Sequence, residues 1–434
     1  MIIIIGAGIS GLVLAHQLYK NNKDFLLLEK SLSNGGYLKS IKKGDYLLEL
    51  GPNSLLADAN VLGYLHSINA TNNIIYSNEV SKERFIYKGG KYRPLPSGPM
   101  SLIFSGFFGM RTKVNVLSEF WKKPQNIDSE SVYSFFERRF GKEICDYALD
   151  PFVSGIYAGD PHKLSIKATF PNIAMYENTH GSVLKGFIKN KQNTSRKKSI
   201  SFKGGMQYLA DCIASNIPKD KILYATTVVN VEKNQNRWVI QAKRNEENIK
   251  IEAEAVVVCT PAFAACDFLR LPILKEVAYA PMAVVHTVYK RKNVSHPLNG
   301  FGGLNPSIEN RFSLGSIWTS SVYQGRCPND EVLFTTFIGG DKQKYKLVEN
   351  EAWQIKLKVH EELSQAFGIN AEQPEMQHFF TWEKALPQYY PSIFSVWEKL
   401  NLLEKDKLYV CANWKDGVSL SDCIEKAEKL AKSL

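Results

Sequence analysis

The first eleven residues constrain the fold of this chain more than any other stretch. Residues 2–5 are four consecutive isoleucines, and glycines follow at positions 6, 8 and 11. A buried parallel strand that turns through this glycine spacing into a helix is the fingerprint of a dinucleotide-binding fold. Gly6 permits the tight turn, Gly8 lets the backbone approach a pyrophosphate, and Gly11 allows close packing of the helix on the strand.

The residues after the glycines complete a strand–helix–strand unit. Apolar spacing predicts a helix from residue 9 up to Asn21 and Asn22, followed by a second strand at residues 25–28. Glu29 ends that strand, where a carboxylate binds ribose hydroxyls, and the helix N-terminus offers free N–H groups to phosphates. The sequence therefore predicts a bound dinucleotide. Because the motif begins at the first residues, we expect no signal or transit peptide.

Length and charge narrow the remaining classes of protein. A chain of 434 residues exceeds one simple core, so two or three domains are expected. The net charge of +11 favours anionic partners, either carboxylated substrates or an acidic bilayer surface. The cations are scattered and no nucleic-acid-binding motif is present, so we predict no nucleic-acid partner.

Cysteine and histidine usage argues against a metal or a hydrolytic centre. The seven cysteines show no C-x-x-C spacing and the eight histidines no ligand spacing, which predicts reduced thiols and no metal site. The chain also lacks the G-x-S-x-G motif of serine hydrolases.

A glycine pair after the ribose-binding acid indicates which dinucleotide is bound. Gly35 and Gly36 follow Glu29, and a strand at residues 46–50 ends in an acid two residues before Gly51. This arrangement resembles the opening of the FAD-binding amine-oxidase-like superfamily, which implies that the cofactor is FAD.

Longer stretches narrow the resemblance to one branch of that superfamily. They are residues 130–143, 150–165, 181–183, 201–207, 299–304 and 335–340, and they run in order over nearly the whole chain. These stretches resemble those of the oxygen-dependent protoporphyrinogen oxidases.

This resemblance and the order of predicted elements imply an α/β protein with three parts. The first is a discontinuous Rossmann-like FAD-binding domain made of residues 1–78, 200–265 and 405–434. The second is a mixed α+β substrate-binding domain of residues 79–97 and 266–404. The third is a helical membrane-associating domain of residues 98–199, in which a helix is predicted to begin at Ser129.

The activity implied by the resemblance is the FAD-dependent oxidation of protoporphyrinogen IX to protoporphyrin IX in haem synthesis. Six electrons leave in three hydride transfers to the flavin, with molecular oxygen as acceptor, so no side chain is assigned a catalytic role. Three alternatives stay open. They are a coproporphyrinogen III oxidase of the same family, another flavin oxidase of the superfamily, and a non-catalytic tetrapyrrole-binding protein.

The resemblance also implies the residues of the site. The residues predicted to contact the porphyrinogen are Arg84, whose guanidinium suits a propionate, and Asn53, Gly155, Leu304, Ile317 and Phe337. Those predicted to contact FAD are Gly6, Gly8, Gly11, Glu29, Gly35, Gly36, Gly51, Val229, Asn413 and Val418. Four positions, Ser33, Tyr37, Ala412 and Ser421, depart from the family pattern, and these departures predict weaker FAD binding.

An apolar segment at residues 100–110 bears on location. It is shorter than the roughly 18 apolar residues of a membrane span, and basic residues and Trp121 flank it. We expect insertion into one leaflet through side chains that include Phe107 and Phe108, with a buried core helix as the alternative. The expected location is cytoplasmic, peripheral to the inner membrane. The sequence shows no legible subunit interface, so both a monomer and a homodimer stay open.

Overall fold

The four N-terminal isoleucines form the central strand of a parallel sheet. The computed structural model describes residues 1–96, 98–190, 197–245 and 247–434. The sheet has five strands in the order β10-β2-β1-β14-β20, and every neighbouring pair is parallel. Its strands are β10 (Ile222–Leu223), β2 (Phe25–Leu28), β1 (Ile2–Ile5), β14 (Ala255–Val258) and β20 (Leu408–Val410). Side chains cover both faces of β1, which explains its uniformly apolar sequence.

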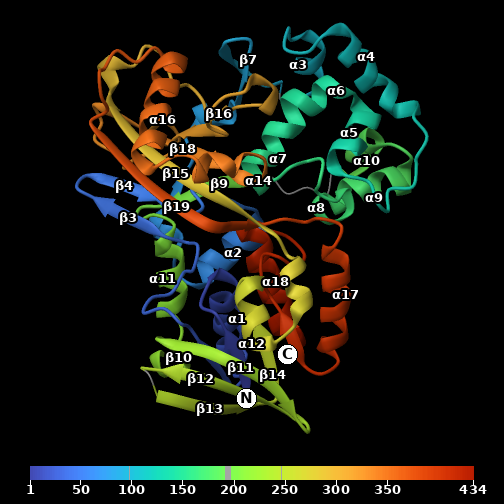
Figure 1. The fold of residues 1–434 in the computed structure, drawn as a ribbon, viewed down its shortest axis with the longest axis vertical. Helices are drawn as coiled ribbons and strands as arrows, with labels where there is room; N and C mark the ends of the chain where they lie inside the picture. Colours follow the sequence, from blue (N-terminus) through green and yellow to red (C-terminus); the bar gives the residue numbers. More distant parts are fainter. Residues whose placement is uncertain (97, 191–196, 246) are drawn as a thin grey trace.

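Helices cover one face of the parallel sheet and a mixed layer covers the other (Figure 1). The first face carries α1 (Ile9–Lys20), α2 (Ala59–Ser67), α11 (Gln207–Ser215) and α18 (Leu420–Ser433). The second face carries α12 (Ala262–Leu269), α17 (Ile393–Glu404) and an antiparallel sheet of β11 (Thr226–Asn234), β12 (Arg237–Arg244) and β13 (Glu247–Ala253). The predicted strand–helix–strand unit at the N-terminus is confirmed, with helix α1 ending before Asn21.

Helix α17 falls within residues 266–404, the range predicted for the substrate-binding domain, but it packs on the parallel sheet. Its buried residues Ile393, Val396 and Leu400 pack in the same cluster as strands β1, β14 and β20. The range predicted for the substrate-binding domain thus includes a helix that packs on the parallel sheet.

A seven-stranded sheet forms the second layer of the molecule, in the order β19-β15-β18-β17-β16-β7-β8. All neighbouring pairs are antiparallel except β16 and β7, which are parallel. Helix α16 (Ala352–Phe367) covers one face through four buried apolar residues spaced at one turn. The strands are β19 (Met376–Pro387), β15 (Tyr279–Lys290), β18 (Glu331–Gly339), β17 (Gly315–Trp318), β16 (Gly302–Leu304), β7 (Phe85–Lys88) and β8 (Lys91–Pro94).

Short elements connect the two large sheets. Two small antiparallel sheets contain β3 (Ser40–Lys43) with β4 (Tyr46–Glu49), and β5 (Leu55–Ala57), β9 (Lys198–Phe202) and β6 (Ile74–Tyr76). Three one-turn helices adjoin the seven-stranded sheet: α13 (Thr319–Val322), α14 (Gly340–Gln343) and α15 (Tyr345–Val348).

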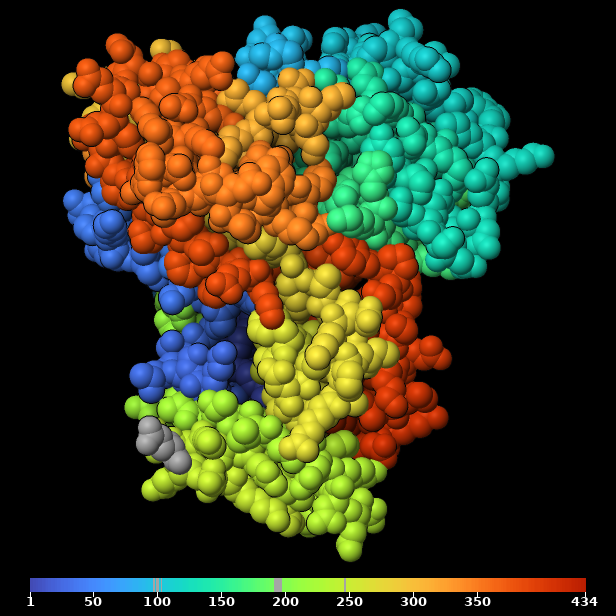
Figure 2. All heavy atoms as spheres, viewed as in Figure 1, coloured from blue at the N-terminus to red at the C-terminus, as the bar shows by residue number. Residues whose placement is uncertain are grey.

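The residues between β8 and β9 form a helical region. Its helices are α3 (Pro99–Phe104), α4 (Met110–Ser118), α5 (Val132–Phe140), α6 (Lys142–Ile144), α7 (Asp150–Tyr157), α8 (Ile166–Thr169), α9 (Pro171–His180) and α10 (Val183–Asn190). Figure 2 shows this region beside the seven-stranded sheet, at the end of the molecule opposite β11, β12 and β13. The prediction that α5 begins at Ser129 was wrong, because the helix begins at Val132, three residues later, with Ser131 as its cap. Ser131 caps the helix because its hydroxyl accepts from the Ser134 N–H.

Buried charges hold the helical region together. The Arg139 guanidinium donates from Nε to Glu119 Oε1 at 2.8 Å, and both side chains are fully buried. Glu119 also accepts from the Val183 N–H at the start of α10. The ion pair therefore places α10 against the rest of the region.

The structure corrects one expectation about the membrane. Phe107 and Phe108 are 6% and 4% exposed and pack against Ile86 of β7, so these two side chains belong to the core. No helix among the described residues combines the length and apolar character needed to span a membrane.

Candidate functional site

A cavity of about 1970 Å³ lies between the parallel sheet, the seven-stranded sheet and the helical region. It contains every residue that the sequence assigned to the site except Gly11. From the FAD-binding list these are Gly6, Gly8, Glu29, Gly35, Gly36, Gly51, Val229, Asn413 and Val418, and from the substrate list Asn53, Arg84, Gly155, Leu304, Ile317 and Phe337. The chain thus brings together residues up to several hundred positions apart.

The glycines of the N-terminal motif differ in what surrounds them. A Cβ atom on Gly8 would meet nothing within 4 Å, so the backbone there faces open space in the cavity. A Cβ atom on Gly11 would lie 2.0 Å from the Gly6 carbonyl oxygen, so Gly11 serves the packing of α1 on β1. Gly8 precedes α1 without a side-chain cap, and the first turn carries no acidic residue. This end of the cavity fits a pyrophosphate.

Glu29 is held next to the glycine motif. Its Oε2 accepts from the Ala7 N–H at 2.7 Å, and its Oε1 accepts from the Ser31 N–H at 2.8 Å. The carboxylate is half-buried at the end of β2 and lines the cavity. Its position fits the ribose of a dinucleotide.

A buried carboxylate that sequence reasoning did not assign to the site lies at the end of β4, two residues before Gly51. Glu49 is 2% exposed and pairs with Arg326, whose Nη1 lies 3.1 Å from Glu49 Oε1. The carboxylate also accepts from the Met206 N–H and from the Ser40 hydroxyl. Burial raises the pKa of Glu49, although the Arg326 guanidinium acts in the opposite direction. Glu49 and Arg326 are far apart in the sequence, so only the folded structure shows that they are partners.

Lys426 organises the C-terminal turn that contains Asn413 and Val418. Its ammonium donates to the carbonyls of Ala412 at 2.8 Å and Gly417 at 2.9 Å, and to that of Lys415. These contacts satisfy carbonyl groups in a turn that would otherwise depend on solvent. Sequence reasoning missed Lys426 because it lies on α18, after the turn.

Tyr389 also holds this turn. Its hydroxyl donates to the Asn413 carbonyl at 2.7 Å and accepts from the Gly417 N–H at 3.1 Å. A lysine from α18 and a tyrosine after β19 therefore position one turn together.

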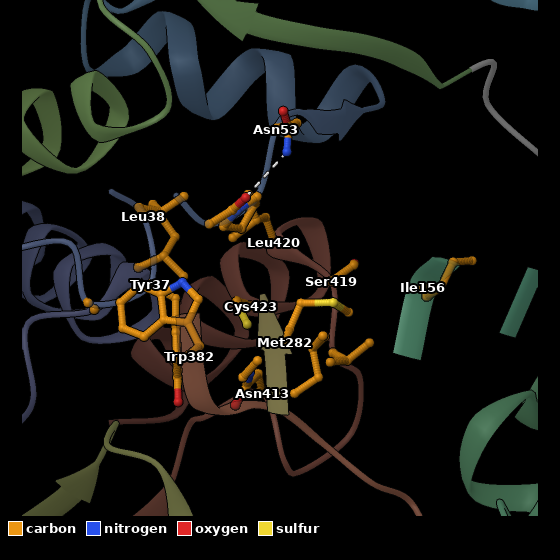
Figure 3. A pocket seen from close by; sticks show the side chains of 18 of the residues that line it. Tyr37, Leu38, Asn53, Ile156, Met282, Trp382, Asn413, Ser419, Leu420 and Cys423 are labelled. Atoms are coloured by element: carbon orange, nitrogen blue, oxygen red, sulfur yellow. Dashed lines mark hydrogen bonds between the residues drawn. The ribbon is translucent and has the colours of Figure 1, made fainter. Parts of the chain in front are cut away.

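Tyr37 joins the FAD-binding end of the cavity to β19. Its hydroxyl donates to the Lys384 carbonyl at 2.5 Å, and its ring lies 4.9 Å from that of Trp382, edge to face. Trp382 in turn donates from Nε1 to the Leu50 carbonyl at 2.7 Å. Burial raises the pKa of Tyr37 to about 12, so the phenol is neutral at pH 7. Figure 3 shows the two rings together on one wall, with Ile156 on the opposite wall.

The other departures from the family pattern have ordinary surroundings. The Ser421 hydroxyl donates to the Leu56 carbonyl, Ala412 is buried, and Ser33 is exposed and lines the cavity. Weaker FAD binding through these residues stays a prediction.

Arg84 provides a cation that no acidic side chain neutralises. Among the described residues its side chain forms no ion pair and no hydrogen bond, and its guanidinium lies 4.6 Å from the centre of the Phe301 ring. Partial desolvation lowers the pKa of Arg84, which nevertheless remains charged at neutral pH. The side chain lines the cavity, where its guanidinium can donate hydrogen bonds to a carboxylate of a ligand.

Three apolar side chains of the substrate list lie on the seven-stranded sheet. Leu304 of β16 pairs with Gly315 of β17, which pairs with Phe337 of β18, so these residues form one row across the sheet. Ile317 lies two positions further along β17. Gly155 of α7 faces this row, since a Cβ atom there would lie 3.3 Å from Leu304 Cδ2. A side chain at position 155 of α7 would therefore press on Leu304 of the sheet.

The helical region contributes a wall that sequence reasoning did not assign to the site. Its described residues that line the cavity are apolar apart from Ser154 and Gly155. They include Phe136, Phe140, Ile144, Ala148, Leu149, Phe152, Ile156, Phe170, Ile173, Val183 and Phe187. The apolar periodicity of these helices predicts buried faces, and only the tertiary structure shows that the faces enclose a cavity.

The remaining cavity-lining cations of the described residues are lysines away from this wall. Lys30 follows Glu29, while Lys39 and Lys384 belong to the two segments that Tyr37 joins. Within the described ranges, no group of three or more His, Cys, Asp or Glu side chains could hold a metal ion.

The sequence is similar over nearly its whole length to a known protein family and to individual oxidases. The profile of the "Flavin containing amine oxidoreductase" family matches residues 9–433. A mitochondrial protoporphyrinogen oxidase of Nicotiana tabacum is 31% identical, over 97% of this chain and 92% of its own length. A coproporphyrinogen III oxidase of Bacillus subtilis (strain 168) is 25% identical, over 98% of this chain and 96% of its own length.

Solved structures share the fold. A crystal structure from Exiguobacterium sp. 255-15 has a TM-score of 0.81 at 20% identity and covers 100% of this chain and 98% of its own. Reduced UDP-galactopyranose mutase has a TM-score of 0.73 at 14% identity, over 100% of this chain and 96% of its own. At these identities the likeness concerns the fold alone.

Proposed function

The chain belongs to the flavin containing amine oxidoreductase family, and from this membership we propose that it oxidises protoporphyrinogen IX to protoporphyrin IX. Its cofactor is FAD, and the open space at Gly8, the uncapped start of α1 and the position of Glu29 all fit that dinucleotide. The relatives named protoporphyrinogen oxidase cover nearly the whole chain, which supports the choice of substrate class.

The observation that carries the proposal is the polarity of the substrate end of the cavity. Among the described residues, Arg84 is the one guanidinium that lines the cavity, and it shares the substrate end with the apolar wall of the helical region. Protoporphyrinogen IX carries two vinyl groups where coproporphyrinogen III carries two further carboxylates. An apolar wall suits vinyl groups, whereas buried carboxylates need cations nearby.

The residues of this chain bind and orient the substrate. Arg84 holds a propionate, while Leu304 and Phe337 form a flat apolar surface and Gly155 leaves room for the macrocycle on the opposite side. When bound, FAD supplies the hydride acceptor, and the protein supplies position and excludes water. Asn53 Oδ1 has no hydrogen-bond partner among the described residues, so it offers an acceptor for a pyrrole N–H.

The test is the appearance of porphyrin fluorescence when FAD-loaded protein meets each porphyrinogen in air. We expect faster protein-dependent oxidation of protoporphyrinogen IX than of coproporphyrinogen III. The reverse order would assign the chain to coproporphyrinogen III. No rate above the spontaneous background with either would favour a non-catalytic tetrapyrrole-binding protein.

We further propose that molecular oxygen accepts the electrons. Oxygen uptake and peroxide release in proportion to porphyrin formed would support this acceptor. Porphyrin formation that needs an added quinone and proceeds without oxygen would contradict it.

We also propose that the protein rests on an anionic membrane surface in the cytoplasm through the helical region. Phe104, Met110 and Trp121 are 78%, 74% and 80% exposed, and basic residues such as Arg111 and Lys123 lie near them in the chain. Replacing the three by serine should reduce flotation with anionic liposomes. The matched control is Leu32→Ser, since Leu32 is 87% exposed in the FAD-binding half. Unchanged flotation of the triple variant would contradict this orientation.

A further inference from the structure

Three cysteine thiols meet at the FAD-binding end of the cavity, and the proposed mechanism uses none of them. Cys259 follows β14 and Cys411 follows β20. Val258 pairs with Val410 in parallel register, and the Cys411 N–H donates to the Val258 carbonyl at 2.9 Å. The two cysteines are therefore the next pair of positions on neighbouring strands.

The side chains of this pair lie on the same face of the sheet. Both pack in the apolar cluster that contains α1 and α18, and their positions next to each other on neighbouring parallel strands make the two thiols neighbours. Cys411 is 3% exposed, whereas Cys259 is half-buried and lines the cavity. One sulfur is thus reachable from the cavity and the other lies behind it.

Cys423 on α18 is the third thiol of the group. It lines the cavity below Leu420 and beside Ser419, as Figure 3 shows. Burial raises the pKa of Cys423, and the Ser10 hydroxyl of α1 acts in the opposite direction, so this thiol has a polar neighbour outside the pair.

We propose that Cys259 and Cys411 form a peroxide-sensitive pair that closes to a disulfide beside the FAD site. The inference rests on the proposed function, because an oxidase that passes electrons to oxygen releases hydrogen peroxide within this cavity. A disulfide between Cys259 and Cys411 would therefore form in response to the hydrogen peroxide that the enzyme itself releases.

The chemistry balances without another reactant. The Cys259 sulfur attacks one peroxide oxygen, the O–O bond breaks, and the thiol proton leaves with the second oxygen as water. The Cys411 sulfur then attacks the Cys259 sulfenic sulfur, the S–S bond forms, and the S–O bond breaks as a second water leaves with the Cys411 proton. Two thiols and one peroxide give one disulfide and two waters.

The surroundings of Cys411 suit the second step. The neighbouring Cys259 thiol and the ammonium of Lys426 lower the pKa of Cys411 against the opposing effect of burial, which favours the Cys411 thiolate, whereas burial raises the pKa of Cys259. Lys426 is the residue that holds the turn after Cys411.

The disulfide would act on FAD through two neighbours. The Cys259 Cβ lies 3.3 Å from where a Cβ on Gly11 would stand, and Cys411 precedes the turn that begins at Ala412. Drawing the two sulfurs to a bonding distance of about 2.05 Å moves these segments toward each other. We expect the oxidised protein to lose FAD faster than the reduced protein. By linkage, bound FAD should slow the oxidation.

The experiment treats FAD-loaded protein with added hydrogen peroxide, blocks free thiols by alkylation, and maps peptides by mass spectrometry without reduction. We expect a Cys259–Cys411 peptide link that dithiothreitol reverses, while buried Cys145 stays a thiol. FAD released through an ultrafilter should rise with the linked fraction. In Cys411→Ser, Cys259 should instead be trapped as a sulfenic acid by dimedone, and the control Cys266→Ser should behave like wild type.

Several results would overturn the proposal. They are the absence of the link, a link to Cys423 in its place, oxidation of Cys145 at the same rate, or an unchanged loss of FAD once the link has formed. A second arm supplies porphyrinogen in air, with or without catalase. A link formed by added peroxide but not during turnover would leave the thiol site standing and count against oxygen as the acceptor.

Discussion

The FAD-binding end and the substrate end of the cavity are built by different means. At the FAD-binding end, glycines, a helix start and one acid lie within residues 6–29, and the ligand meets backbone groups. At the substrate end, single side chains come from β7, β16, β17, β18 and the helical region, which are far apart in the chain. Backbone recognition needs a local conformation and leaves a short motif. Side-chain recognition needs only that residues meet in space, so it leaves no spacing to find.

Gly8→Val should have the largest effect and tests the FAD-binding end. The new side chain would enter the open space at Gly8 and exclude the pyrophosphate, so FAD binding should be lost. The measurement is the flavin absorbance of the purified protein. Thermal stability of the apoprotein should change little, because nothing lies within 4 Å of the new Cβ.

The matched control for that variant is Gly63→Val. Gly63 on α2 also has nothing within 4 Å of a Cβ, but it lies outside the cavity. This control should retain FAD. A yellow Gly8→Val protein would place the dinucleotide elsewhere.

Arg84→Ala should have the next largest effect and tests the substrate end. Loss of a charge-assisted contact of about 1.5–3 kcal/mol should raise KM by roughly ten- to a hundredfold. FAD content should remain normal, because Arg84 lies on the substrate side. The control is Arg237→Ala on β12, whose side chain is 60% exposed and lies outside the cavity. A normal KM in Arg84→Ala would remove Arg84 from the site.

Lys426→Met sharpens the comparison, because this side chain acts on FAD only through the backbone turn. Three carbonyls lose a charged donor. The dissociation constant for FAD should rise by about tenfold, corresponding to about 1.4 kcal/mol. Titration of apoprotein with FAD, followed by flavin fluorescence, measures it. The neighbouring exposed Lys429→Met provides the control, and equal affinities for the two variants would show that the turn does not need Lys426.

Ile156→Arg should have the smallest effect and tests the apolar wall. A cation there should favour a substrate with more carboxylates, at about 1 kcal/mol for a partly exposed pair, or roughly fivefold. The ratio of kcat/KM for coproporphyrinogen III to that for protoporphyrinogen IX should rise. Ile156→Gln adds polarity without charge and should leave the ratio near that of wild type. A ratio unchanged by the arginine would show that the wall does not select between the two substrates.

Sequence reasoning succeeded where the chain carries its own local signal. The isoleucine run, the glycine spacing and Glu29 predicted β1, α1 and β2 with the observed boundaries. It failed where two local signals compete, as at the start of α5. Ser129 and Ser131 are both good caps, and the contact with Ser134 selects the second.

The apolar segment at residues 100–110 illustrates a different limit. Exposed and buried phenylalanines look alike in a sequence, and Phe104 and Phe107 differ only in what packs on them. Ile86 of β7 covers Phe107 and Phe108, whereas Phe104 faces outward. The packing partner lies in another part of the chain, so composition could not distinguish them.

The sequence by itself determined the dinucleotide-binding unit, because glycine conformations and strand burial are properties of neighbouring residues. Only the tertiary structure decided which side chains meet: that Arg84 has no acidic partner within the described ranges, that Glu49 pairs with Arg326, and that an apolar helical wall faces the sheet. Burial, pairing and polarity depend on residues brought together by folding, and these are the quantities that set ligand charge and shape.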